Sequence, residues 1–181
     1  MLEEAGIDYD LELVEVRNPQ REDSKEFRAA SPMGKVPALV DGKVQMSESA
    51  AICLYLADRY SSGALAPAID DPLRGKFLYW LMYAPAVMEP AMSEKFNGVE
   101  SNRGRNGWGD FDLMIETLES GLKKSAWILG GKFTAADVMV GSSAVFMRMF
   151  DMLPKSSAID AYADRCLNRR AYQKALSVEK T

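Results

Sequence analysis

The sequence of 181 residues contains no histidine and only two cysteines, Cys53 and Cys166. Without an imidazole the chain has neither a histidine base nor a histidine metal ligand, and we expect no metal cofactor. Two cysteines so far apart form neither a CxxC motif nor a disulfide framework, which argues against a disulfide oxidoreductase. This cysteine usage indicates a reducing, cytoplasmic setting.

An excess of positive charge is also lacking. The chain carries 22 Lys and Arg against 26 Asp and Glu, a net charge of −4, so it has no surplus to neutralise nucleic-acid phosphates. The longest apolar run, residues 77–88, is too short to cross a bilayer and contains Pro85. Residues 1–4 are acidic where a signal peptide would be basic. We therefore expect neither a nucleic-acid partner nor a membrane association.

The first third of the chain mixes helix and strand signals, which predicts an α/β domain over residues 1–62. Gly6 ends a helical segment, and residues 9–16 alternate between apolar and polar, as in a half-buried strand. A short helix is expected within residues 18–30. Two short strands, residues 36–40 and 43–46, flank an Asp41-Gly42 turn, and Ser47 then opens a helix to residue 60.

The remainder of the chain has helical periodicity, which predicts an all-α domain over residues 72–181. Residues 61–72 are rich in Gly, Pro and Asp and form a linker. Helices are expected over residues 73–96, 109–125, 134–149 and 156–177. The third of them begins with a capping box of Thr134 and Asp137, for which we predict a structural role.

Two neighbouring segments carry the residues with the clearest chemistry. Pro37 opens a strand, where a cis bond would turn the backbone of Val36 outward as an edge for an extended peptide. Glu48 and Ser49 lie at a helix N-terminus, whose N–H groups and dipole attract a carboxylate, while the glutamate suits an ammonium group. Together they favour a site for a free amino-acid end. The alternative is plain capping by Ser47, with Glu48 favoured by the helix dipole.

These segments resemble the glutathione transferase family, in its cytosolic, bacterial-type form. Val36 and Pro37 match its Val–cis-Pro pair, Glu48 and Ser49 its acidic residue followed by serine, and the capping box its counterpart in the second domain. The resemblance extends over nearly the whole chain. It implies a thioredoxin-like N-terminal domain followed by an all-helical C-terminal domain.

The resemblance also implies a function and roles for individual residues. The Val36 backbone would pair with the cysteinyl part of glutathione, Glu48 would hold its ammonium group, and Ser49 the neighbouring carboxylate. Lys35 would reach the glycyl carboxylate, or is a solvated loop lysine. Glutathione is then the co-substrate of a cytoplasmic homodimer that conjugates it to a hydrophobic electrophile in detoxification. A non-catalytic binding or scaffold protein of the same fold is the alternative.

The chain departs from the family pattern at its start. The family begins with a strand and a loop that bears the thiol-activating Tyr, Ser or Cys, and here Met1 falls inside the helix that follows. We therefore expect the first strand and catalytic loop to be missing, and assign no catalytic residue. Tyr9 and Ser47 are poor substitutes, because Tyr9 lies on the next predicted strand and Ser47 is read as a cap. Without that strand, residues 9–16 and the hairpin would present unpaired edges.

Other side chains leave two interpretations open. Aromatic residues and methionines crowd residues 77–88, where the family places part of its substrate pocket, although packing in a core is the ordinary role of such a stripe. Cys53 is expected in the core. Cys166 lies near Arg165, Arg169 and Arg170, which would lower its pKa, or it belongs to an exposed structural helix.

Overall fold

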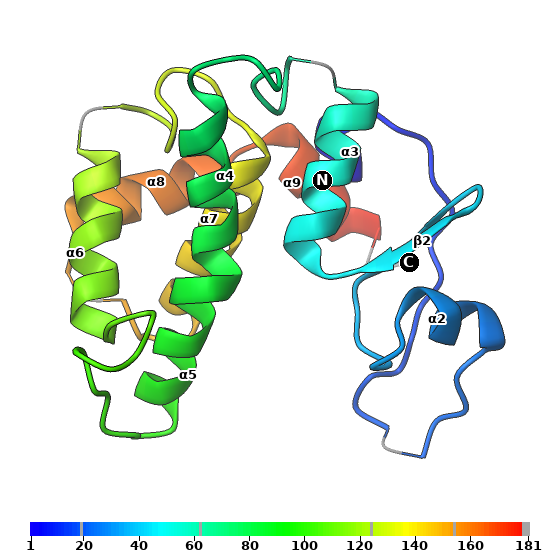
Figure 1. Ribbon diagram of the computed structural model, residues 1–181, viewed down its shortest axis with the longest axis horizontal. Helices are drawn as coiled ribbons and strands as arrows, with labels where there is room; N and C mark the ends of the chain where they lie inside the picture. The colour runs from blue at the N-terminus through cyan, green and yellow to red at the C-terminus, as the bar shows by residue number, and fades with distance from the viewer. Residues whose placement is uncertain (19, 62, 124, 154, 179–181) are drawn as a thin grey trace.

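Two lobes make up the computed structural model, which describes residues 1–18, 20–61, 63–123, 125–153 and 155–178 (Figure 1). The chain first forms the lobe at the right of that view, which contains a β-hairpin and helices. It then forms the helical lobe at the left. The predicted architecture, an α/β domain followed by an all-α domain, is therefore observed.

Glycines and helix caps determine where the elements of the first lobe end. These elements are α1 (Leu2–Ala5), α2 (Lys25–Ala30), β1 (Ala38–Asp41), β2 (Val44–Ser47) and α3 (Ser49–Tyr60). Gly6 ends α1 with a φ of 65°, as predicted, and Gly42 turns the hairpin with a φ of 60°. Ser47 does not open α3 as predicted. It is the last residue of β2, where it pairs with Ala38.

Residues 9–16 do not form the strand that their alternating pattern predicts. In the described part of the chain β1 pairs only with β2, so this segment has no neighbouring strand. Leu13 is 79% exposed, and a slot of about 580 Å³ is lined by this segment on one side and by β1 on another. A strand is stable when its N–H and C=O groups pair with a neighbour, so alternation alone could not produce one here.

The second lobe has more breaks than its periodicity predicts. Its elements are α4 (Arg74–Tyr83), the π-helical turn η1 (Ala84–Met88), α5 (Glu89–Phe96), α6 (Phe111–Leu122), α7 (Ala135–Met149), α8 (Ser157–Leu167) and α9 (Arg170–Val178). The helix predicted over residues 73–96 is interrupted by η1, which contains Pro85, and a proline has no N–H to donate to the helix. The segment predicted as one helix over residues 156–177 is divided into α8 and α9. Among the described helices, none combines the length and apolar composition that crossing a membrane requires.

The core of the second lobe forms where α7 packs between α4 and α8. Most of the aromatic residues and methionines of residues 77–88 lie in it, as the core interpretation requires: Phe77, Trp80, Tyr83 and Met88 are buried. Tyr79 and Met82 remain exposed on α4. Dispersion and hydrophobic burial over these large side chains stabilise the domain that carries the capping box.

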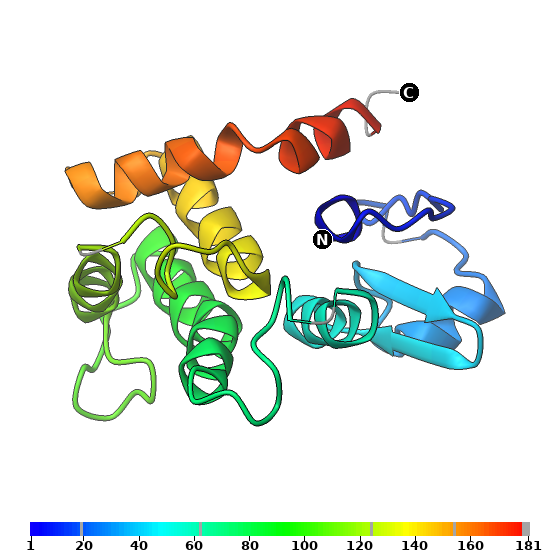
Figure 2. The ribbon, with the colours of Figure 1, turned by 90° about the horizontal axis from the view of Figure 1, so that it is seen from above.

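The ends of the chain are joined by an ion pair between α1 and the segment before α9. Arg169 donates from Nε and Nη2 to both carboxylate oxygens of Glu4, at 2.5 and 2.6 Å, and its guanidinium lies 3.6 Å from the centre of the Phe133 ring. The Lys174 ammonium contacts Glu3 at 2.7 Å. Figure 2 shows α9 extending from the helical lobe over α1 of the first lobe. These contacts connect the two lobes.

Candidate functional site

The register of the hairpin brings the two candidate segments to one place. Ala38 pairs with Ser47 at the open end of the antiparallel ladder. Pro37, which precedes Ala38, and Glu48, which follows Ser47, therefore leave the hairpin at the same end, and α3 begins at the next residue, Ser49. The candidate site combines a loop, a strand end and a helix N-terminus in one small region.

The loop side of this region is exposed to solvent. Val36 is 50% exposed, and Lys35 and Pro37 are exposed as well. The Val36–Pro37 peptide bond is cis, as predicted. The N–H and C=O groups of Val36 lie just before β1, where a bound extended peptide could continue the pairing pattern of a strand.

The helix side presents a carboxylate in an unusual backbone conformation. Glu48 has a φ of 74° and is exposed, although a side chain with a Cβ rarely adopts a positive φ. As the N-cap of α3 it makes no side-chain hydrogen bond to the first turn, unlike Ser24, Asp110 and Ser156 at the starts of α2, α6 and α8. Strain of this kind often occurs at functional sites, and the first amides of α3 receive no hydrogen bond from a capping side chain.

A second carboxylate, in the helical lobe, interacts electrostatically with Glu48. Burial, and after it the negative charge of Glu48, raise the pKa of Glu89, the first residue of α5. The sequence analysis missed Glu89, because no spacing rule connects residue 48 with a residue of the other lobe. The π-helical turn that precedes it is a feature often found at functional sites, but it was visible only in the structure.

Removing the charge of Glu89 should stabilise the protein slightly at neutral pH. The folded state raises the pKa of Glu89, so it favours the protonated form, and ionised Glu89 lowers the free energy of unfolding above that pKa. Glu89→Gln should therefore unfold at a higher urea concentration at pH 7, and this gain should vanish as the pH falls below the ordinary glutamate value. Glu116→Gln, at an exposed position of α6, is the control. An equal gain at low and neutral pH would contradict this account.

The capping box of α7 is structural, as the sequence analysis predicts. Asp137 is 1% exposed, and its carboxylate accepts hydrogen bonds from the Thr134 N–H at 2.9 Å and the Ile128 N–H at 2.8 Å. The Tyr162 hydroxyl donates a further bond at 3.0 Å. The Thr134 hydroxyl is a fourth donor to this carboxylate. Burial raises the pKa of Asp137, and the four hydrogen bonds oppose this effect by stabilising the charged form. Every oxygen of this carboxylate is thus used to hold the fold together.

The remaining candidate groups are not placed for chemistry. Both cysteines are free and buried, and desolvation raises the pKa of Cys53 to about 11 and of Cys166 to about 12. The interpretation of Cys166 as an arginine-activated thiol is therefore wrong, since its burial outweighs the nearby positive charge. The Tyr9 hydroxyl donates to Glu3 at 3.0 Å, and burial raises its pKa. No group of acidic or cysteine side chains in the described ranges could hold a metal ion.

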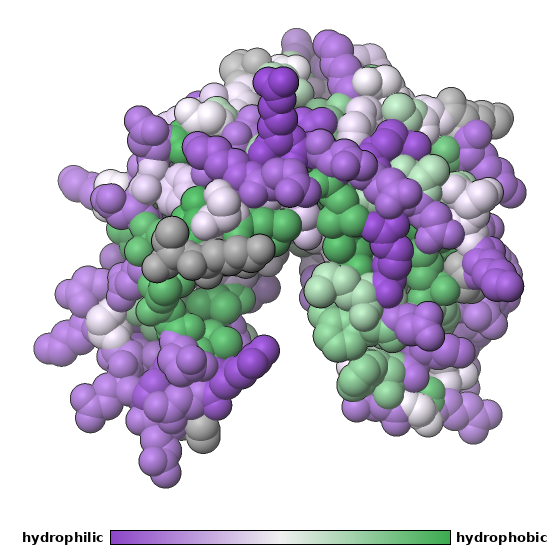
Figure 3. Space-filling model, turned by 180° about the vertical axis from the view of Figure 1, so that it is seen from behind, coloured by the Kyte–Doolittle hydropathy of each residue, from purple (hydrophilic) through white to green (hydrophobic). Residues whose placement is uncertain are grey.

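A notch separates the two lobes on the face seen in Figure 3, and hydrophobic residues occupy both of its walls. Three phenylalanines at the ends of α5 and α7 form an exposed aromatic cluster in the helical lobe. The Phe146 and Phe150 ring centres are 4.4 Å apart, and Phe96 lies 6.2 Å from Phe150. Apolar surface of this kind is suited to binding a hydrophobic molecule.

Two family models match the two halves of the chain. The model described as glutathione S-transferase, N-terminal domain, matches residues 1–59, and the model described as glutathione S-transferase, C-terminal domain, matches residues 77–165. The glutathione S-transferase GstA of Escherichia coli O157:H7 is 27% identical over 185 residues, which cover 98% of this chain and 90% of that protein.

Solved structures agree with these sequence matches. A glutathione transferase from Methylococcus capsulatus strain Bath has a TM-score of 0.82 at 27% identity, with 99% of this chain and 90% of that chain covered. A sphingomonad glutathione S-transferase, solved in complex with glutathione, has a TM-score of 0.75 at 25% identity over the same shares of the two chains. The fold is that of a thioredoxin-like domain with a small two-stranded sheet, followed by a helical domain. The chain therefore belongs to the glutathione S-transferase family.

Proposed function

We propose that this protein binds glutathione and transfers its thiolate to a hydrophobic electrophile. The observation that carries the proposal is the hairpin register, which brings the Val36 loop and the Glu48–Ser49 helix start together at the open end of β1 and β2. Relatives of similar length carry the name glutathione S-transferase, and the sphingomonad structure contains glutathione. Both findings support the assignment of this substrate.

The charges at the site complement those of glutathione. The tripeptide has an ammonium group and a carboxylate at its γ-glutamyl end and a second carboxylate at its glycyl end. Glu48 would pair with the ammonium group, while Ser49 and the uncapped amides of α3 would bind the adjacent carboxylate. Val36 would exchange backbone hydrogen bonds with the cysteinyl residue, and Lys35 would approach the glycyl carboxylate. The two ends of one ligand thus meet groups of opposite sign.

The reaction requires the thiol of the bound glutathione to lose its proton. A thiol of this kind has a pKa of about 8.5, so most of it is protonated at neutral pH. The thiolate sulfur would then attack an electrophilic carbon, forming a C–S bond while the displaced group leaves with the bonding electrons. Because hydrophobic residues occupy both walls of the notch, we expect the electrophile to be hydrophobic. We further propose a homodimer that acts in the cytoplasm in detoxification.

Binding and turnover measured on the same sample test this proposal. Isothermal calorimetry should detect glutathione binding, and a generic electrophile should be consumed at a rate that saturates with glutathione. A protein that does not bind glutathione would contradict the proposal as a whole. Binding without turnover would favour the alternative, a non-catalytic glutathione-binding protein of the same fold. A pH titration of the glutathione thiol in the complex would distinguish two causes of missing turnover. An unchanged thiol pKa would indicate failed activation, and a lowered thiol pKa would indicate failed binding of the electrophile.

A further inference from the structure

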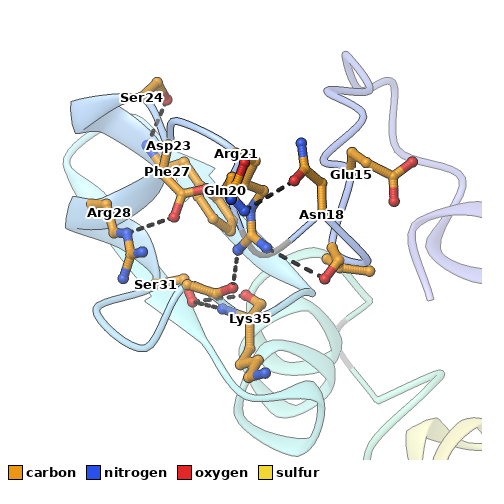
Figure 4. A network of polar contacts seen from close by, with 12 residues as sticks. Glu15, Asn18, Gln20, Arg21, Asp23, Ser24, Phe27, Arg28, Ser31 and Lys35 are labelled. Atoms are coloured by element: carbon orange, nitrogen blue, oxygen red, sulfur yellow. Dashed lines mark hydrogen bonds and ion pairs between the residues drawn. The ribbon is translucent and has the colours of Figure 1, made fainter.

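The loop that leads into Val36 is closed by a single buried hydroxyl (Figure 4). Ser31 donates from Oγ to the Lys35 carbonyl at 2.7 Å and accepts from the Lys35 N–H at 3.0 Å. Ser31 is 1% exposed, so water does not compete for these bonds. Both backbone groups of the residue before Val36 are thereby fixed by one side chain.

Two arginines hold the same loop by its other carbonyl groups. Arg21, in the segment before α2, donates from Nη2 to the Gly34 carbonyl at 2.5 Å. Arg28, within α2, donates from Nη1 to the Pro32 carbonyl at 3.2 Å. Figure 4 shows the Arg21 guanidinium between the loop that carries Ser31 and Lys35 and the segment that precedes α2. Charged donors of this kind form the stronger class of hydrogen bond.

One buried carboxylate orients both guanidinium groups. Asp23 Oδ1 accepts from Arg21 Nε at 2.7 Å, and Arg28 Nε forms an ion pair with Asp23 Oδ2 at 2.6 Å. The Asp23 side chain is only 4% exposed. A carboxylate in this position costs desolvation free energy unless it is paired, and Asp23 is paired with Arg21 by a hydrogen bond and with the half-exposed Arg28 by an ion pair alone.

Gly34 allows the arginines to approach the loop this closely. It has a φ of 64°, and a Cβ built on it would lie 2.9 Å from Arg28 Cζ. The Arg28 guanidinium therefore rests on the bare backbone of Gly34. A side chain at this position would be strained by the positive φ and would displace the guanidinium.

We infer that Arg21, Asp23, Arg28 and Ser31 are positioning residues of the glutathione site. None of them belongs to the groups proposed to contact glutathione, and this inference rests on that proposed function. Their bonds end on residues 32–35, so they act through the backbone that carries Val36. A loop that is ordered before the ligand arrives does not lose conformational freedom on binding, which favours a higher affinity.

Arg21→Met tests this inference, because methionine keeps much of the side-chain length and removes every donor. We expect the glutathione dissociation constant and KM to rise about tenfold, with kcat at saturating glutathione unchanged. Arg148→Met is the control, since it removes an Arg148–Asp164 ion pair of 2.7 Å between α7 and α8. Because Asp164 is largely exposed, this control should change the melting temperature less than Arg21→Met does, and it should leave the glutathione dissociation constant unchanged.

Ser31→Ala provides an independent variant that changes no charge. It should raise the glutathione dissociation constant and, in the free protein, speed hydrogen exchange at the Lys35 amide more than at amides of α7. The inference is supported if either folded variant binds glutathione about tenfold more weakly than the Arg148→Met control. It is overturned if the folded variants bind within twofold of the unaltered protein, or lose melting temperature alone. If the unaltered protein does not bind glutathione, the proposed function fails and this inference fails with it.

Discussion

Replacing Asp137 by alanine should lower the free energy of unfolding by about 3–5 kcal/mol, the cost of breaking a buried charged network. The substitution leaves the buried N–H groups of Ile128 and Thr134 and the Tyr162 hydroxyl without their acceptor. Each unsatisfied buried group costs roughly 1–3 kcal/mol, and the removal of a desolvated charge offsets part of that cost. For a chain of this length we expect the melting temperature to fall by about 6–20 °C.

Two further variants separate the possible contributions of Asp137. Asp137→Asn keeps the shape and one acceptor oxygen, so its loss of stability should lie between those of alanine and the unaltered protein. Asp112→Ala removes an exposed acidic residue from the first turn of α6, where it interacts with the helix dipole and with the charge of Arg103. This substitution should cost no more than about 1 kcal/mol. Urea unfolding measures all three. A loss for Asp137→Ala that equals that of Asp112→Ala would show that the buried hydrogen bonds contribute no net stability.

Replacing Glu48 by alanine should weaken glutathione binding by roughly ten- to a hundredfold, because a hydrogen bond to a charged group contributes about 1.5–3 kcal/mol. The ammonium group of the γ-glutamyl end would lose its partner, while the positive end of α3 would remain. Calorimetry measures the affinity directly. Glu116→Ala, at an exposed position of α6, is the matched control and should leave the affinity unchanged.

A glycine at residue 48 should separate binding from stability. Glu48 has a φ of 74°, which costs a residue with a Cβ roughly 1 kcal/mol or more. Glu48→Gly removes this strain as well as the carboxylate. This variant should therefore bind glutathione as weakly as Glu48→Ala does, but its melting temperature should be higher than that of Glu48→Ala. If both variants bind glutathione as tightly as the unaltered protein, Glu48 is only a charge at the start of a helix.

Several features of the fold follow from signals within a few residues. The left-handed Gly6 and Gly42, and the capping box of Thr134 and Asp137, appear where the sequence analysis predicts them. Such signals act through covalent neighbours, so a short window of sequence contains the whole interaction. The alternation of residues 9–16 was misleading because a strand also needs a neighbouring strand to pair with, and a short window of sequence does not show whether one is present.

The residues of the candidate site likewise fall into those that local sequence patterns indicate and those that only the tertiary structure reveals. Local patterns indicated Val36, Pro37, Glu48 and Ser49 as candidates, because a strand start and a helix start have recognisable residues. Lys35 was added by the family resemblance. The sequence alone therefore determined the family and the order of the two domains, and it proposed the residues at the open end of the hairpin as a site. Only the tertiary structure decided that Glu48 acts electrostatically on Glu89, that Arg169 pairs with Glu4, and that Arg21 and Arg28 share Asp23. These pairs depend on how elements pack in space, and long polar side chains can reach many partners until packing and desolvation select one.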